Sequence, residues 1–374
     1  MAFQFIHTGD WHLAKSFGRF DAETAPLLRD ARMRIVDRVG DLARRTGCDV
    51  VLVAGDVFDG LMVADEVLRK LAARLEQFTD VAWHFLPGNH DPAVANGVWQ
   101  RFAKFADAAH VVVHHEAGLH HISADVDLLT APLRARAIAH DPTAWMAERE
   151  RAAGTIRVGL AHGAVQGFGS AGEASVLIAP DRAITADLDY LALGDWHGVR
   201  QAGPRAWYAG TPEPEQFPDN EPGYALSVAI ADPGAEPTVE RHWLATYVWR
   251  RAVLSGDALA ALGDVERSVA DAGAEAANML LRLDVGGRAT LAGAVELRER
   301  IERLRDRTLF LEADYAQLRI DSRELGPDTF TDPLLAAVGE RLAARAAGEG
   351  PDAAVAHDAL LLLAALSRDE EAAA

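Results

Sequence analysis

The sequence predicts an α/β fold, and three observations support this. Over residues 1–245, short apolar runs typical of buried strands alternate with stretches whose apolar residues recur at helical spacing. The loop that follows each of five strand-like runs carries Asp, Asn or His within its first three residues. The tetrapeptide Gly-Asp-Trp-His occurs twice, at residues 9–12 and 194–197, each time after an apolar run. In an open α/β sheet such loops gather at one edge, where ligands bind.

The five strands that precede these loops are expected at residues 3–8, 49–54, 81–86, 156–161 and 190–193. Residues 25–45 are expected to form a helix, because their apolar side chains recur near a period of 3.6 and Gly47 follows as a stop signal. Residues 63–78 show the same pattern and predict a second helix. The alternation predicts a largely parallel sheet covered by helices.

A first domain, residues 1–247, is expected to end with three more strands. These are placed at residues 207–210, 224–230 and 239–249. The three prolines within residues 211–218 exclude regular structure there, because proline fixes φ and lacks an N–H donor.

Two smaller parts are expected beyond this domain. Residues 248–322 predict a small α+β domain without Asp or His loops, with strands at 248–254, 278–284 and 309–320 and helices at 258–272 and 291–305. Residues 323–374 are rich in Ala and Leu and predict a helical C-terminal segment. Its run at 355–366 is too dense in leucine for an exposed helix, so we expect this segment to dock on a partner chain or on the α+β domain.

Composition narrows the class of protein. A chain of 374 residues is too long for one ordinary core. It has no uncharged apolar stretch of the roughly 18 or more residues that a membrane span needs. The N-terminal residues enter a strand pattern without a signal segment, and Cys48 is the single cysteine. These features together predict a cytoplasmic protein without a disulfide or a membrane association.

The net charge of −19, from 37 basic and 56 acidic residues, argues against broad, non-specific affinity for nucleic acid. It does not exclude a nucleic-acid substrate, because bound metal ions can supply positive charge at a site and a partner subunit can supply a binding surface. An acidic surface also serves solubility, and the sequence leaves these two interpretations open.

The side chains after the first two strands are of the kind that bind divalent metals. Asp10 and His12 stand two residues apart, and in an extended segment they would point to the same side. Asp56 follows Gly55, which lets the backbone turn closely beside an ion. A carboxylate can also bridge two ions. Alternatively, Asp56 caps the next turn, as Asp59 could do.

The segment after the third strand is the most specific of the five. Asn89 can offer its amide oxygen to a metal, His90 is a candidate acid, and Asp91 could orient the His90 imidazole. The alternative for this segment is an exposed polar turn.

His162 follows the fourth strand and His197 ends the second tetrapeptide. Either histidine alone would more often be structural. The five loops together provide enough donors for two metal ions, an arrangement suited to in-line attack on phosphorus. The sequence lacks the Gly-x-x-x-x-Gly-Lys phosphate loop.

These motifs resemble those of the calcineurin-like metallophosphoesterases. The matching positions are Asp10 and His12, Gly55-Asp56, residues 88–91, His162 and residues 194–197. Residues 6–12 and 208–212 resemble the SbcD-type DNA-repair nucleases in particular. The resemblance covers residues 1–245, and residues 248–322 resemble the capping domain of that subfamily in layout only.

The resemblance implies a four-layer αββα core that holds two Mn²⁺ or similar ions. In the expected architecture, the small α+β domain, which is like a capping domain in layout, and the helical C-terminal tail follow this core. The implied ligands are Asp10, His12 and His197 for one ion, Asn89 and His162 for the other, and Asp56 for both. His90 would be the acid near the leaving oxygen, oriented by Asp91. Proteins of this type act as homodimers with an SbcC-type ATPase and cut DNA.

One position departs from the family pattern. The family has Gly-His-x-His in its last motif, whereas Asp195 stands here where the first histidine would ligate the second metal. Two divalent ions with Asp10, Asp56 and Asp195 sum to about +1, against about +2 in the usual set, so substrate phosphate would be held less strongly and harder ions favoured.

We therefore expect a two-metal phosphodiesterase, a DNA exonuclease or endonuclease of SbcD type that acts in DNA repair. One alternative is a phosphatase or cyclic-nucleotide phosphodiesterase on the same core. Another is a non-catalytic scaffold subunit whose altered metal site, with Asp195, binds a single ion.

Overall fold

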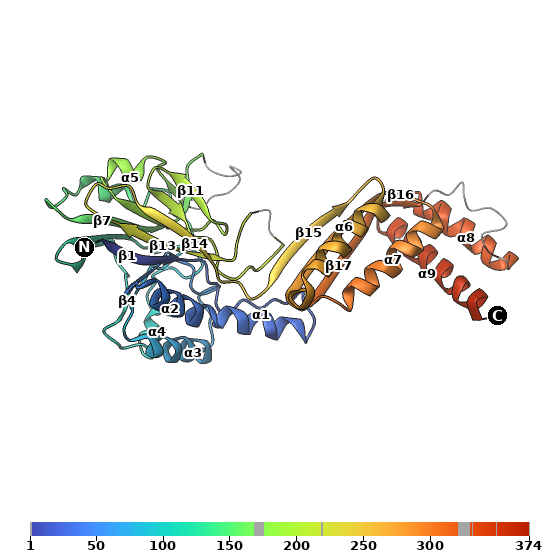
Figure 1. Ribbon diagram of the computed structural model, residues 1–374, viewed down its shortest axis with the longest axis horizontal. Coiled ribbons are helices and arrows are strands. Elements are labelled where there is room, and N and C mark those ends of the chain that lie inside the picture. The colour runs from blue at the N-terminus through green and yellow to red at the C-terminus, as the bar shows by residue number, and fades with distance from the viewer. Residues whose placement is uncertain are drawn as a thin grey trace. The chain divides into compact units, whose positions relative to one another are not determined.

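The computed structural model describes residues 2–167, 176–217, 220–320, 330, 332–348 and 350–373. The chain divides into two compact units, Met1–Thr246 and Tyr247–Ala374 (Figure 1). All residues of the predicted metal site belong to the first unit.

The first unit contains two six-stranded sheets. One has the order β14-β13-β1-β2-β3-β4, and its strands are β1 (Phe3–Thr8), β2 (Val50–Val53), β3 (Ala82–Phe85), β4 (Val111–Val113), β13 (Tyr224–Ile230) and β14 (Thr238–Trp243). Strands β1 to β4 are parallel, while β13 and β14 are added antiparallel.

The other sheet has the order β11-β12-β10-β7-β6-β5. Its strands are β5 (Gly118–Ser123), β6 (Val126–Ala131), β7 (Ile156–His162), β10 (Tyr190–Gly194), β11 (Arg200–Gly203) and β12 (Ala206–Tyr208). The four strands β6, β7, β10 and β12 are parallel, and β5 and β11 flank them antiparallel. A separate pair is formed by β8 (Ala164–Val165) and β9 (Leu177–Ile178).

The two sheets pack face to face, and helices cover their outer faces. Neighbouring residues of a strand point to opposite sides, so Phe5 joins the core between the sheets while Ile6 joins the core beneath the helices. Both are fully buried, which explains why the central strands read as continuous apolar runs. The layer order is that of the expected four-layer αββα core, and the fold class is confirmed.

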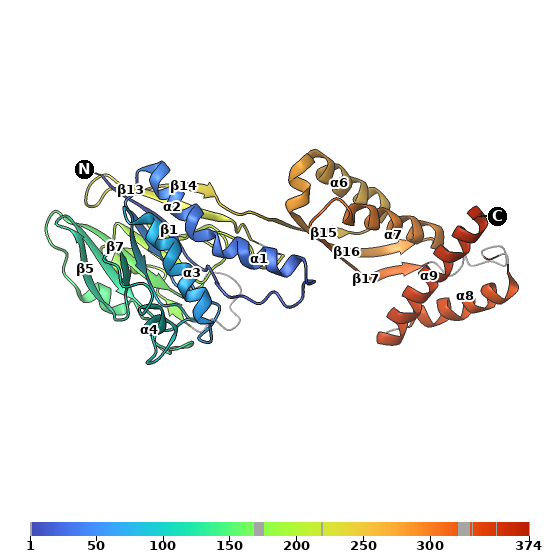
Figure 2. The same ribbon diagram turned by 90° about the horizontal axis from the view of Figure 1, so that it is seen from below.

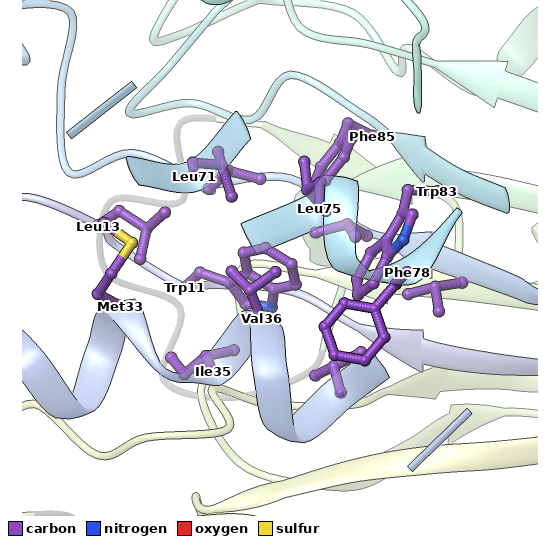
Figure 3. Packing of buried hydrophobic residues seen from close by; sticks show 14 of the residues in the cluster. Trp11, Leu13, Met33, Ile35, Val36, Leu71, Leu75, Phe78, Trp83 and Phe85 are labelled. Atoms are coloured by element: carbon purple, nitrogen blue, oxygen red, sulfur yellow. The ribbon is translucent and has the colours of Figure 1, made fainter. Parts of the chain in front are cut away.

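Helices α1 (Thr24–Met33), α2 (Ile35–Thr46), α3 (Asp65–Leu75) and α4 (Val98–Phe102) belong to the first sheet, with the 3₁₀ turn η1 (Glu76–Phe78). Figure 3 shows part of this core, where Trp11 and Trp83 lie among aliphatic side chains of α2 and α3. The second sheet is covered by α5 (Arg182–Thr185) and the 3₁₀ turn η2 (Ala144–Glu148).

Several expectations about single elements were wrong. The helix expected over residues 25–45 is two helices that meet at Arg34, where ψ is −5°, and the apolar pattern continues across this break. The strand expected over residues 239–249 ends at Trp243, and a new strand begins at Val248. The alternation of strands and helices alone predicted one largely parallel sheet, whereas the first unit contains two mixed sheets; strands β4, β5 and β6 were not identified from sequence.

The second unit is built on three parallel strands, β15 (Val248–Leu254), β16 (Met279–Ala289) and β17 (Phe310–Ile320), in that order. Their crossovers contain α6 (Ala258–Asp271), the 3₁₀ turn η3 (Gly273–Asn278) and α7 (Leu291–Arg305), and Figure 2 shows α6 and α7 lying beside the strands. Two further helices follow, α8 (Pro333–Ala346) and α9 (Pro351–Ala373).

Side chains of α8 and α9 share one buried cluster with α7 and the sheet. Leu360 and Leu361 of α9 are 0% and 1% exposed and lie in the same cluster as Ile301 and Leu304 of α7. A division of this unit into a capping domain (residues 248–322) and a partner-binding segment (residues 323–374) stays a prediction. Within the part of the chain that the structure describes, no helix is long and apolar enough to cross a membrane.

Candidate metal centre

The predicted site residues lie at the carboxyl ends of strands from both sheets of the first unit. Asp10, Asp56 and Asn89 come from loops that follow β1, β2 and β3. His162 is the last residue of β7, and Asp195 follows β10 directly. The five loops therefore meet across the interface between two sheets, rather than along one edge of a single sheet.

Asp10 and His12 reach the site through a left-handed turn, so the expectation of an extended segment at this point was wrong. Strand β1 ends at Thr8, and φ is 52° at Asp10 and 44° at His12. Their backbone N–H groups donate to Gly55 O at 3.0 Å and to Asp56 O at 2.9 Å. Asp56 also has a positive φ, of 51°. Such conformations are uncommon outside glycine and often accompany functional sites.

Two glycines allow the loops to approach one another more closely than a side chain would permit. A Cβ at Gly88 would lie 2.2 Å from Asp56 Oδ1, and one at Gly194 would lie 1.9 Å from Ala54 O. Contacts below 3.0 Å essentially never occur for real Cβ atoms, so a side chain at either position would push the neighbouring loop away.

The donor atoms of six predicted residues form overlapping groups. Within each group the atoms lie within 4.8 Å of one another, and the groups are Asp10–His12–His197, Asp10–Asp56–His162 and His12–Asp56–His90. Asp10 and Asp56 are 0% and 2% exposed, and each belongs to two groups. Asp195 and Asn89 lie beside them, because Asn89 Nδ2 donates to Asp195 Oδ1 at 3.3 Å.

His162 supplies a direct test of whether a cation fits this site. Its Nδ1 lies 2.8 Å from Ala54 O, a carbonyl that can only accept, so in the neutral ring Nδ1 carries the proton and Nε2 presents its lone pair. That Nε2 is buried and has no hydrogen-bond partner among the described residues, yet it lies 3.5 Å from Asp56 Oδ2 and 3.8 Å from Asp195 Oδ1. A lone pair that faces two carboxylates needs a cation or a proton between them. The donor set therefore fits a divalent metal.

Burial and the neighbouring charges shift the pKa values of several of these groups. Burial raises the pKa of Asp10 to about 7. Burial alone would lower the pKa of His162, but the carboxylates of Asp56, Asp10 and Asp195 together raise it to about 9. Burial likewise raises the pKa of Asp195 above its ordinary value. A bound cation would displace the proton that the cluster otherwise takes up.

His90 and Asp91 differ in their surroundings. The His90 N–H donates to Asp56 Oδ1 at 2.9 Å, and His90 Nδ1 lies 3.3 Å from the carbonyl oxygen of Asp59. Asp91 is fully buried, and its two carboxylate oxygens accept from the N–H groups of Gly88 at 2.7 Å and Phe58 at 3.0 Å. The carbonyl oxygen of Asp59, rather than the expected Asp91 carboxylate, is therefore the group that contacts the His90 ring. Asp91 instead links the loop that carries Gly88 to the loop that carries Phe58.

Sequence reasoning missed a group of charged residues behind the site. His197 Nδ1 lies 3.2 Å from Glu215 Oε1, and Glu215 is also 3.3 Å from Nη2 of the buried Arg32. Arg32 could have been suspected, because it falls on the same helical stripe as Leu28, and a charge there needs a buried partner. Glu215 lies in the proline-rich segment, where the sequence gives no periodic pattern.

The comparison with known protein families agrees with this geometry. Residues 3–199 match the calcineurin-like phosphoesterase family. The chain is similar to the SbcD subunit of the nuclease SbcCD from Rhodobacter capsulatus, with 28% identity over 284 residues that cover 61% of this chain and 65% of that relative. Among solved structures it is similar to TT1561 of Thermus thermophilus, with 13% identity and a TM-score of 0.40 over 65% of this chain and 100% of that one.

Proposed function

Because the chain belongs to the calcineurin-like phosphoesterase family, we propose that it is a phosphodiesterase that uses two divalent metal ions and cleaves DNA. The observation that carries the metal requirement is Nε2 of His162, which is buried between the carboxylates of Asp56 and Asp195 without a hydrogen-bond partner among the described residues. The preference for DNA is supported by the similarity to a nuclease subunit.

The proposed ligands are Asp10, His12 and His197 for one ion, Asn89, His162 and Asp195 for the other, and Asp56 for both. The mixture of carboxylate, amide and imidazole donors suits Mn²⁺. When bound, such ions lower the pKa of a water and offset the charge that develops on the phosphoryl oxygens.

In this proposal the chain's own residues position the substrate and move one proton. The ring centroid of His90 lies 4.8 Å from that of His12, and His90 would donate a proton to the leaving oxygen. The contact between its Nδ1 and the Asp59 carbonyl leaves Nε2 as the donating atom. Asp91 fixes the backbone on which His90 stands.

We further propose that the protein works as a homodimer with an SbcC-type ATPase. The net charge of −19 implies that a partner supplies much of the basic surface that contacts DNA. Exposed apolar residues on the last two helices could receive such a partner; they are Leu334 and Val338 on α8 and Val355 and Leu362 on α9.

A substrate comparison with purified protein tests the proposal. Linear DNA, bis(p-nitrophenyl) phosphate, a cyclic nucleotide and a phosphomonoester would be incubated with Mn²⁺, with and without an SbcC-type ATPase, beside an Asp56→Asn variant as a negative control. Metal-dependent degradation of DNA is expected, and the ATPase should increase it. Turnover of the monoester or the cyclic nucleotide alone would assign a different substrate, and binding of one ion without turnover would indicate a scaffold subunit.

A further inference from the structure

Lys15 joins two carboxylates, and each of these carboxylates faces one imidazole of the candidate metal centre. Lys15 Nζ lies 3.0 Å from Glu215 Oε2 and 3.4 Å from Asp59 Oδ1. The other oxygen of Glu215 lies 3.2 Å from His197 Nδ1, and Asp59 Oδ1 lies 3.2 Å from His12 Nδ1. The ammonium group of Lys15 thus contacts both carboxylates that face the Nδ1 atoms of His12 and His197.

The backbone places Lys15 for this contact. The Lys15 N–H donates to His12 O at 3.2 Å, so the lysine belongs to the same turn that brings His12 into the site. Leu13 N donates to Val57 O and Asp59 N donates to Leu13 O, which ties this turn to the loop that carries Asp59. Lys15 and Asp59 therefore stand on two loops that are joined by backbone hydrogen bonds.

Arg32 is a second cation that contacts the Glu215 carboxylate. Its guanidinium is buried, donates to Glu213 O at 2.9 Å and to the carbonyl of Trp11, and lies 3.3 Å from Glu215 Oε2. Glu215 thereby receives charge from both Arg32 and Lys15, while its second oxygen faces His197.

Two simpler roles for Lys15 fit these contacts less well. An exposed ion pair contributes little to stability and would be incidental, but the Lys15 side chain is only 28% exposed and the Glu215 side chain only 8%. A lysine that receives a substrate phosphate would have its ammonium free, whereas this one is engaged by two carboxylates.

We propose that Lys15 is a positioning residue for the ion bound by Asp10, His12 and His197. By fixing Asp59 and Glu215, it fixes the carboxylates that face Nδ1 of each imidazole, so that both rings direct Nε2 toward the ion. The proposal rests on the metal centre described under the proposed function. Residues that orient a metal ligand typically change metal affinity by about 10–100-fold when they are replaced.

The sign of the effect separates this role from simple electrostatics. Lys15 is a cation close to a cation site, so its charge alone would oppose metal binding, and its removal would tighten binding. A positioning role predicts the opposite, since the two imidazoles lose their fixed orientation. The loss should fall on one ion only, because His162 is held independently by Ala54 O and Asn89 by Asp195.

The test measures metal binding to the full-length chain rather than turnover. Stepwise Mn²⁺ titration by calorimetry and Co²⁺ titration by visible absorption would be done on the wild type and on Lys15→Met, Lys15→Gln and Lys15→Arg. Lys70→Met is the matched control, because Lys70 is an exposed lysine whose Nζ lies 2.7 Å from Glu66 on the same helix.

Lys15→Met and Lys15→Gln are each expected to weaken one of the two binding steps by about 10–100-fold and to leave the other unchanged. Lys15→Arg should restore most of that affinity, and Lys70→Met should match the wild type. Unchanged or tighter binding in both neutral variants would overturn the proposal, as would equal weakening of both steps. If one neutral variant does not fold, the other decides the result.

A double variant checks that Lys15 acts through Glu215. Lys15→Met combined with Glu215→Gln should weaken the same step little more than the stronger single change, because both break one chain of contacts. If the two changes weaken this binding step additively, Lys15 does not act through Glu215. If the wild type itself binds fewer than two ions, the proposed function fails on its own, before any Lys15 variant is compared.

Discussion

The backbone N–H of Asp195 donates to both carboxylate oxygens of Asp10, at 3.1 and 3.2 Å. This contact joins the two copies of the Gly-Asp-Trp-His tetrapeptide, one from each sheet. Asp195 has a φ of 103°, in a region where aspartate is uncommon, so its position is enforced by the surrounding loops. The Asp195 side chain then turns toward Asn89 and His162.

We expect Asp195 to ligate the second ion. Asp195→Asn keeps a side chain that tolerates positive φ but removes the charge, and should lower both the occupancy of the second ion and phosphodiesterase activity. Asp195→His should retain two ions and exceed Asp195→Asn in Mn²⁺-supported activity. Metal content by mass spectrometry and kcat on bis(p-nitrophenyl) phosphate check this. Two tightly held ions with full activity in Asp195→Asn would show that Asp195 is not a ligand.

Gly88 should be indispensable for a geometric reason. A methyl group at residue 88 would lie 2.2 Å from Asp56 Oδ1 and 2.5 Å from Asp56 N, so Gly88→Ala must displace the proposed bridging carboxylate. We expect metal affinity and activity to fall together, with a loss of stability of about 1–3 kcal/mol from overpacking. Gly60→Ala is the control, because a Cβ there has no neighbour within 4 Å. Equal behaviour of the two variants in metal titration and urea unfolding would refute this account.

His90→Asn should separate chemistry from metal binding. His90 contributes its backbone N–H to Asp56, and this contact survives the change, while the imidazole that would protonate the leaving oxygen is lost. We expect a reduction in kcat of about 10²–10⁴-fold with nearly unchanged metal content. Near-normal kcat with both ions bound would remove His90 from the mechanism.

Local sequence pattern identified the elements whose apolar residues follow one clear period. The bounds of β1, β13, β15 and α7 agree with those expected, because each is a run with a single period and a clear end. Strand β4 has three residues, and β5 contains two adjacent histidines and no fully buried residue, so neither gives a strong pattern. The pairing of strands into two sheets depends on contacts between distant segments, which no local window contains.

The same distinction holds for the site. Side chains that follow strands directly could be proposed as a set, because the ends of parallel strands meet in space. Arg32 and Glu215 are 183 residues apart, and their contact arises only when α1 packs against the proline-rich segment. The role of Asp91 could not be predicted from the sequence either, because its hydrogen-bond partner Phe58 lies in another loop.

Buried histidines away from the metal centre should make the fold sensitive to acid. His84 and His114 lie with Nδ1 and Nε2 3.0 Å apart, and burial lowers their pKa values to about 4 and about 2. The unfolded chain takes up protons near the ordinary value of 6.5 while the folded chain does not, so stability is present above pH 6.5 and falls as the pH drops toward about 4. Each histidine contributes a slope of about 1.4 kcal/mol per pH unit.

Urea unfolding in the presence of EDTA, measured across this pH window, tests the expectation. The double variant His84→Gln/His114→Gln should lose much of the slope, whereas replacement of the exposed His140 by Gln should not. An identical slope in the wild type and the double variant would show that these histidines do not govern the acid response.

The last helix offers a contrast between neighbouring leucines. Leu360 is fully buried in the core of the second unit, whereas Leu362 is 58% exposed. Leu360→Ala should destabilise that unit by about 2–5 kcal/mol, because it leaves a cavity, while Leu362→Ala should change stability by less than about 0.5 kcal/mol. Calorimetric unfolding checks both values.

Leu362→Asp with Val355→Asp should instead weaken association with an ATPase partner or a second copy and spare hydrolysis of a small phosphodiester. If the exposed pair alters neither association nor oligomeric state, this face of α9 is not the docking surface, and the leucine-rich run serves only the core of its own unit.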